Sequence, residues 1–168
     1  MTASKPDILE GLSLGPEFER AYEPIEHLLH PDAIILLDGW RAREAAGGLV
    51  VGLDLPSRLF SKVLRNLIVY EPAEDGRDFR VRLAGTTYLE HYGREVTGLL
   101  MSNLFDRQRF EYNCSVGYEV LRSNKPVLLD ARFKRHGIEQ LHYEIVLLPA
   151  WAPNKVDRWL ICGVFRFS

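Results

Sequence analysis

The strongest constraint on the fold lies in the last third of the sequence, where apolar and polar residues alternate. Residues 127–133 and 141–147 each carry apolar residues at every second position, which is typical of β-strands with one buried face. His136-Gly137 marks a turn between them, and Trp159 to Phe167 forms a closing strand. Because short connections join these strands, the pattern predicts antiparallel pairing.

The last two of these strands are apolar on both faces. We assign Trp159, Ile161 and Phe165 to the inner face, with the alternating residues of 127–133 and 141–147. The other face is also largely apolar, so it should be covered. Two covers remain open: an apolar helix of the same chain, or the same surface of a second subunit in a homodimer. We expect the N-terminal helices to help build the homodimer, which gives these candidate interface residues: Ile34, Ile35, Leu37, Trp40, Val146, Leu148, Leu160, Cys162 and Val164.

The rest of the chain mixes helical and strand patterns. Near-helical spacing predicts helices over residues 18–29, 31–46, 57–64 and 107–123, and a short one within 86–98. Short strands are expected at 67–70 and 79–83, and Gly85 is expected in a strained turn before a helix capped by Thr86 or Thr87. This order predicts an α+β fold: a five-stranded antiparallel sheet with helices on one face and an N-terminal helical extension.

Length and charge limit the classes of function. A chain of 168 residues fits one domain, and a net charge of -2 gives no reason to expect nucleic acid or a membrane surface as partner. No apolar run approaches the roughly 18 residues that span a bilayer, and no secretory signal is apparent. The two cysteines lack metal or redox spacing. We therefore expect a cytoplasmic protein with buried free thiols.

Several short motifs follow one another along the chain: Trp40, Gly47-Gly48, Leu53-Asp54-Leu55-Pro56, Arg82-Leu83-Ala84-Gly85-Thr86, Gly93-Arg94 and Thr97-Gly98. Their order and spacing are similar to those of PAS domains, in particular the small single-domain bacterial PAS proteins long classed as a domain of unknown function. The resemblance covers about residues 38–168, so we divide the chain into a leader with a helical extension (1–37) and a PAS-like domain (38–168). It implies a sheet that cups a small pocket beneath the middle helices, and a role in sensing, ligand binding or partner regulation.

The resemblance also raises two cofactors, and the sequence disfavours both. Flavin-binding relatives carry a reactive cysteine in an Asn-Cys-Arg motif, whereas Asn113-Cys114 is followed here by Ser115. Haem-binding relatives commonly carry an axial histidine on the long central helix, and residues 107–123 contain none. His91 and His142 remain possible axial ligands, although a surface or strand position explains each of them more simply. We predict no cofactor, no metal site and no catalytic residue.

The reading that fits best is a non-catalytic sensory or regulatory module that acts through a protein signalling partner, with a small apolar ligand as a further possibility. Whether the large residues of the interior line a pocket or fill a core stays open. An alternative is an enzyme or ligand carrier on a cone-shaped α+β fold, which would need an acid–base group facing the cavity. A structural oligomerisation module is a third. The candidate pocket residues are Tyr88, Tyr92, Leu104, Phe110, Cys114, Tyr118, Phe133 and Tyr143.

Overall fold

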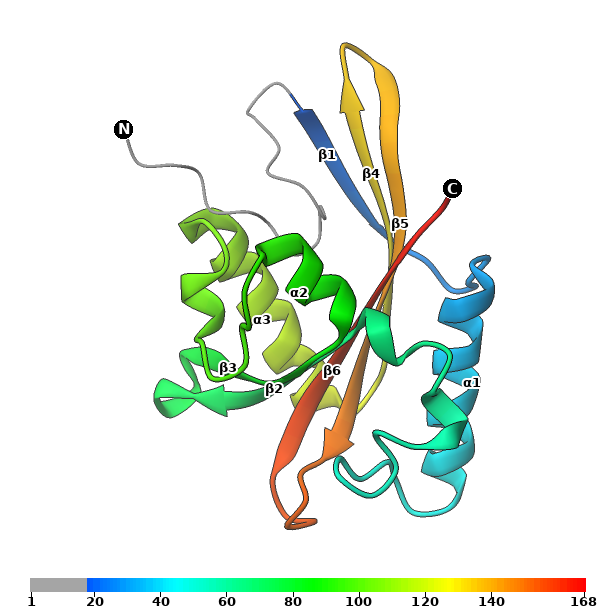
Figure 1. Cartoon of the computed structure of the whole chain (residues 1–168), viewed down its shortest axis with the longest axis vertical. Coiled ribbons are helices and arrows are strands. Elements are labelled where there is room, and N and C mark those ends of the chain that lie inside the picture. The colour runs from blue at the N-terminus through cyan, green and yellow to red at the C-terminus, as the bar shows by residue number, and fades with distance from the viewer. Residues whose placement is uncertain (1–17) are drawn as a thin grey trace.

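One antiparallel sheet of six strands organises the computed structural model, which describes residues 18–168 (Figure 1). Its order is β1-β4-β5-β6-β2-β3, and every neighbouring pair is antiparallel. The strands are β1 (Phe18–Pro24), β2 (Leu67–Ala73), β3 (Asp78–Ala84), β4 (Val127–Arg135), β5 (Ile138–Trp151) and β6 (Arg158–Arg166).

Helices cover both faces of this sheet. Helix α1 (Pro31–Ala45) lies against one face, and α2 (Thr86–Tyr92) and α3 (Arg107–Ser123) lie against the other (Figure 1). The expectation that the helices gather on one face is therefore wrong. Among the described residues, no helix is long and apolar enough to cross a membrane.

The sixth strand, β1, replaces the helix expected over residues 18–29. β1 pairs with β4 along its whole length, and the ring of Tyr22 packs edge-on against Phe133 at 5.9 Å between centroids. The spacing of apolar residues was misleading, because Leu29 is 74% exposed and belongs to no buried stripe. Pro24 lacks an N–H group, which suits the last residue of an edge strand rather than the interior of a helix.

The helix expected over residues 57–64 is also absent. The segment instead forms two short 3₁₀ turns at Arg58–Phe60 and Leu64–Asn66, and the side chain of Ser57 makes no capping hydrogen bond. Phe60 and Val63 are nevertheless buried, so the apolar pattern identified core residues but not the backbone. The helices at 31–45 and 107–123, the short helix α2 and the strands β2 to β6 confirm the remaining predictions.

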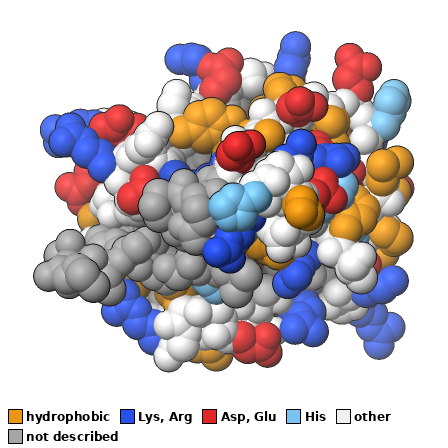
Figure 2. All heavy atoms as spheres, turned by 90° about the horizontal axis from the view of Figure 1, so that it is seen from above, with side chains coloured by type: hydrophobic (Ala, Val, Ile, Leu, Met, Phe, Trp, Pro, Cys, Tyr) orange, Lys and Arg blue, Asp and Glu red, His pale blue; other side chains and the backbone are white. Residues whose placement is uncertain are grey.

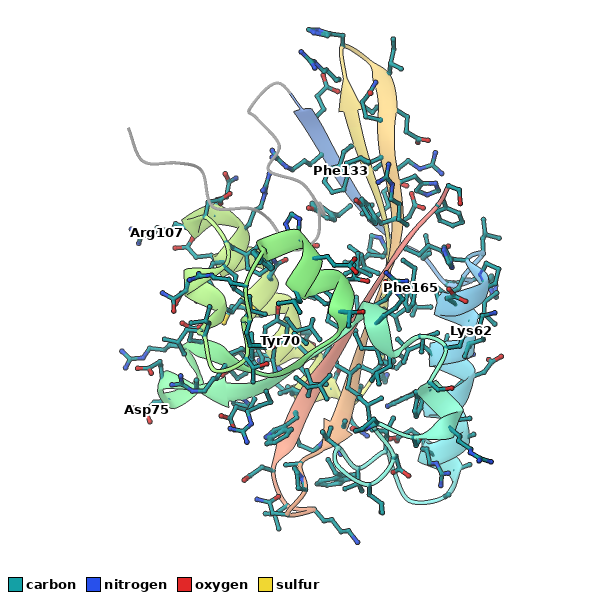
Figure 3. The ribbon with its side chains drawn as sticks, in the orientation of Figure 1. Lys62, Tyr70, Asp75, Arg107, Phe133 and Phe165 are labelled. Carbon is teal, nitrogen blue, oxygen red and sulfur yellow. The ribbon has the colours of Figure 1, made fainter. Side chains whose placement is uncertain are left out.

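Two cores flank the sheet. The larger lies beneath α2 and α3 and contains residues of β4 and β5 at alternate positions, such as Leu129, Phe133 and Ile145. The smaller lies beneath α1 and contains Leu36, Trp40, Val146 and Leu148. Figure 3 shows the same division, with Tyr70 on the side of α2 and α3 and Phe165 on the side of α1.

The faces of β6 are the reverse of those expected. Val164 lies opposite Ile145, and Cys162 lies opposite Leu147, so Leu160, Cys162 and Val164 face α2 and α3. Their alternates face α1. The sequence alone could not show which alternate residues of β6 face α2 and α3, because both sets are apolar. Only the pairing register with β5 distinguishes them. The alternates are Trp159, Ile161 and Phe165.

Helix α1 is fixed to the sheet by polar contacts as well as by its buried residues. The carboxylate of Glu144, which is 1% exposed, accepts hydrogen bonds from the N–H groups of Leu29 and His30 at 2.7–2.9 Å. The His30 ring accepts the N–H of Asp32 and so caps the helix, and the indole of Trp40 donates to the carbonyl of Pro149. The outer face of the sheet is thus covered in the same chain. The boundary expected between residues 37 and 38 falls inside this helix.

Gly85, at the start of α2, lies in contact with neighbouring backbone. Its φ of -67° is ordinary, so the expected strained turn is wrong, and no threonine side chain caps the helix. A Cβ atom at this position would lie 2.3 Å from the carbonyl oxygen of Arg65 and 2.4 Å from that of Leu64. The glycine is required by this close approach rather than by its own backbone angles.

We expect Gly85→Val to destabilise the protein by about 3 kcal/mol, because a carbonyl cannot move aside as a flexible side chain can. Thermal unfolding followed by circular dichroism measures the loss. Thr86→Val places the same valine side chain at the adjacent exposed position and should have little effect. An unchanged melting temperature for Gly85→Val would show that residues 64–66 can move away.

Candidate functional site

A small cavity lies in the larger core, between the sheet and α3. Its wall is apolar apart from a few groups, and its volume of about 30 Å³ is room for roughly one or two water molecules. The interior is therefore almost filled by the protein's own side chains. The lining residues are Tyr70, Met101, Phe105, Tyr112, Asn113, Val116, Leu129, Ile145, Leu147, Leu160 and Cys162.

None of the eight candidate pocket residues lines this cavity. All eight belong to the same core or pack against it. Tyr88 and Tyr118 donate hydrogen bonds to backbone carbonyls of Asn66 and Asp78, as buried tyrosines usually do. The ring of Phe133 packs between Tyr22 and Tyr143. The remaining candidates are Tyr92, Leu104, Phe110 and Cys114.

Three of these candidates instead border an open groove on the outer side of α3. Phe110, Cys114 and Tyr118 line it together with residues of the β2–β3 turn, including Gly76 and Arg77. The Tyr118 ring stacks on Phe79, with centroids 4.3 Å apart. Helix α3 is therefore rotated about its axis relative to the orientation expected from the sequence. Asn113 and Val116 face the cavity instead.

The structure shows why α3 presents that face. A Cβ atom at Gly117 would lie 2.8 Å from the ring of Phe79 and 2.9 Å from Leu160, so α3 packs most closely on the sheet at this glycine. Asn113 lies one turn before Gly117 and Val116 lies immediately before it, and both line the cavity. Gly117 in the middle of a helix was the available signal, because glycine is unfavourable there unless a close approach requires it.

The two cysteines are buried, and neither thiol is activated. Burial raises the pKa of Cys162 to about 12, and burial together with Asp78 raises that of Cys114 to about 11. Burial also raises the pKa of Tyr88 well above 10, with smaller effects of Cys162 and Tyr92. Cysteine nucleophiles depend on a lowered pKa and on access, so the cavity offers no thiolate.

We expect an aromatic disulfide reagent at pH 8 to modify both cysteines slowly in the native protein and rapidly after denaturation. Absorbance at the wavelength of the released thiolate gives both rates. Cys114, at 8% exposed, should react before Cys162, at 4%. A stoichiometric burst in the native protein would contradict the raised pKa values.

A second groove, of about 380 Å³, lies between β1 and the first half of α3. Tyr112 and Asn113 line both this groove and the cavity, so the two hollows share a wall. The Nδ2 atom of Asn113 is buried there and has no hydrogen-bond partner among the described residues. The other lining residues are Arg20, Tyr22, Asp106, Gln108 and Arg109.

The described residues offer little to hold a metal or haem. They contain no group of three His, Cys, Asp or Glu side chains placed to bind a metal ion. His142 is directed away from the cavity: its Nε2 lies 2.5 Å from Asp130, and its ring stacks on Phe167. His91 packs against the adjacent ring of Tyr92 on α2.

The sheet order, the short helices over one face and the cavity beneath them define an α+β domain built on one antiparallel sheet. Residues 30–165 match the PAS domain family, which is most of the chain, so the protein belongs to that family. The PAS family comprises sensory and regulatory modules. A comparison with curated proteins finds no match. β1 lies outside the family match, whereas α1, β2 to β5 and all of β6 but its last residue lie within it.

Proposed function

We propose that the chain is a non-catalytic PAS module that regulates a separate protein by direct contact. The observation that carries this proposal is the nearly filled interior. A cavity of about 30 Å³ is far smaller than the roughly 300–1,000 Å³ of sites that enclose cofactors or substrates. Output through a surface contact fits such an interior better than turnover inside it.

The surface favours a protein partner over nucleic acid. Figure 2 shows basic and acidic side chains interspersed over the described part of the face seen from above, without a field of one sign there. Two of the exposed apolar residues lie at hairpin tips, where Ile138 is 65% and Val156 is 73% exposed. The β4–β5 tip projects together with β1, which is an edge strand of the described sheet (Figure 1), and we assign the partner contact to this end.

Crosslinking in the native cell tests the proposal. The tagged full chain should recover one partner in stoichiometric amount, with crosslinks to residues near Ile138. Ile138→Asp should weaken recovery, whereas Val156→Asp, the same change in charge at an exposed residue of the β5–β6 tip, should not. Recovery of nothing beyond what cells without the tagged chain give would contradict a protein partner, and equal effects of the two aspartates would contradict the assigned surface.

We also propose that the protein acts without flavin or haem. Cys114 follows Asn113 on α3, and burial raises the pKa of its thiol. The Nε2 atom of His142 lies within hydrogen-bond distance of Asp130. Freshly purified protein should be colourless. An absorbance band near 450 nm or a Soret band, at about the wavelengths usual for these cofactors, would overturn this part of the proposal.

A homodimer remains part of the proposal, but through a different surface. Because Val146 and Leu148 are buried beneath α1, a second subunit would have to contact the outer side of this layer, where Ile34 and Leu59 are partly exposed. Light scattering should then give a dimer for the full chain and a monomer for Ile34→Glu. A monomeric full chain would contradict it.

A further inference from the structure

The imidazole ring of His30 joins the start of α1 to the end of β6. Its Nδ1 atom lies 3.1 Å from the backbone nitrogen of Asp32, in the first turn of the helix. Its Nε2 atom lies 3.0 Å from the carbonyl oxygen of Arg166, the last residue of the strand. The rings of Phe165 and Phe167 pack against it, with centroids 5.6 and 5.2 Å away. The ring is thus held where the C-terminal residues run past the start of α1 (Figure 1).

The two backbone partners determine which protonation state of the ring fits. A backbone N–H can only donate, so Nδ1 must offer a lone pair to Asp32. A carbonyl oxygen can only accept, so Nε2 must carry a hydrogen for Arg166. The neutral ring with its hydrogen on Nε2 is the one form that satisfies both partners.

A protonated ring cannot keep both contacts. It carries a hydrogen on each nitrogen, so Nδ1–H would point at the N–H of Asp32 and two donors would face each other across 3.1 Å. The added charge would also lie at the N-terminus of α1, the positive end of the helix dipole. Without the cap, an N–H group of the first turn loses its acceptor. The first turn must therefore move away from a protonated ring.

Neighbouring charges act on the ring in both directions. Glu144 of β5 accepts the backbone N–H of His30, and Asp32 of α1 pairs with Lys62 at 3.7 Å. Both carboxylates favour a cationic ring, whereas the cations Lys62 and Arg166 disfavour it. Among residues 18–168, no ion pair joins the ring to either carboxylate, and its two nitrogens bond to backbone groups. Direct contact at Nδ1 therefore outweighs the more distant, partly screened charges.

A second histidine at this end of the sheet responds in the opposite direction. His142 of β5 stacks on Phe167, with centroids 4.3 Å apart, and its Nε2 atom lies 2.5 Å from the carboxylate of Asp130. Protonation of His142 makes this hydrogen bond charge-assisted and so strengthens it. The stability of the whole protein combines the two opposing effects. A test must therefore measure the first turn of α1 itself.

We propose that His30 is a pH-dependent latch on the start of α1. The neutral ring holds the first turn against the end of β6, and the protonated ring releases it. The released ring accepts a proton at Nδ1 without losing a contact, whereas the latched ring does not. Lowering the pH from about 8 to about 5, the range in which histidines change charge, therefore shifts the equilibrium toward release. A proton thus acts on the helix that covers one face of the sheet, independently of any partner at the β4–β5 tip.

Nuclear magnetic resonance of the full chain tests the latch. At about pH 7.5, where histidines are mostly neutral, nitrogen-15 shifts should place the hydrogen of the His30 ring on Nε2. Hydrogen exchange then follows the N–H of Asp32. Its protection, corrected for the intrinsic effect of pH on exchange, should fall at least about 10-fold between about pH 7.5 and about pH 5.5, because one proton changes an equilibrium by up to tenfold per pH unit. A hydrogen on Nδ1, or unchanged protection, would overturn the proposal.

Three variants identify the group that titrates. His30→Asn keeps a side-chain oxygen as the cap but has no ring to protonate, so the protection of Asp32 should hold at both pH values. His27→Asn removes an exposed histidine that precedes the helix, and His142→Gln removes the opposing one. Both should retain the fall of about 10-fold. A fall that persists in His30→Asn, or that disappears in His142→Gln, would assign the pH dependence to another group and overturn the latch.

Discussion

A chain that begins at Gly52 is expected to aggregate rather than fold. It would lack α1 and the segment after it, and with them the buried residues Leu36, Leu37, Trp40 and Leu49. Losing a buried side chain of this size costs about 2–5 kcal/mol, while a whole domain is stable by only about 5–15 kcal/mol. The exposed face of β5, β6 and β2 would then be an open apolar surface.

A matched truncation separates the role of α1 from that of β1. A chain that begins at Glu26 loses β1 but keeps α1 and the N–H groups of Leu29 and His30 that bind Glu144. It should remain soluble and unfold cooperatively at a lower temperature. Light scattering and thermal unfolding distinguish the two chains. A soluble, cooperatively unfolding chain from Gly52 would show that the sheet needs no cover.

Glu144→Gln is expected to destabilise the protein by about 2–4 kcal/mol. The carboxylate accepts the N–H groups of Leu29 and His30, and hydrogen bonds to a buried charged acceptor are stronger than neutral ones. The amide would place an NH₂ group against at least one of these donors. Urea unfolding gives the loss of stability, and hydrogen exchange should show it first in α1.

The same strand supplies a control carboxylate. Glu139 is exposed and pairs with Arg132 at 3.0 Å. An exposed ion pair contributes about 0–1 kcal/mol, so Glu139→Gln should leave stability nearly unchanged. If Glu144→Gln and Glu139→Gln had equal effects, Glu144 would not hold the start of α1 to the sheet.

How much the sequence predicts depends on whether one local pattern determines the answer. Strands β4 and β5 alternate clearly, with Phe133, Tyr143 and Ile145 on one face, so their positions and inner faces were predictable. The sequence of β6 is apolar throughout, so its phase depended on a pairing register that no local pattern contains. Because the inward and outward faces of β6 were exchanged in the prediction, Leu160 and Cys162 were assigned to an interface. Both residues line the cavity instead.

The site was predicted less well than the fold, and the reason is geometric. Large aromatic residues are the obvious candidates for a pocket wall, but Tyr88, Phe133 and Tyr143 fill the core around the cavity rather than facing it. The position of the cavity depends on the rotation of α3, which the close approach at Gly117 sets. β1 was missed because residues 18–29 mix two spacings, and its partner β4 lies more than a hundred positions away.

At Gly163, only the backbone of β6 separates α1 from the cavity on the opposite side of the sheet. A Cβ atom there would lie 2.7 Å from Leu36 of α1, while the preceding residue, Cys162, lines the cavity on the opposite side. Protein interiors are packed as densely as organic crystals and transmit displacement rather than absorbing it. A molecule that displaces β6 outward from the cavity therefore displaces α1 as well. Only the backbone of β6 separates the cavity from the helix here, so the position of α1 depends on what fills the cavity.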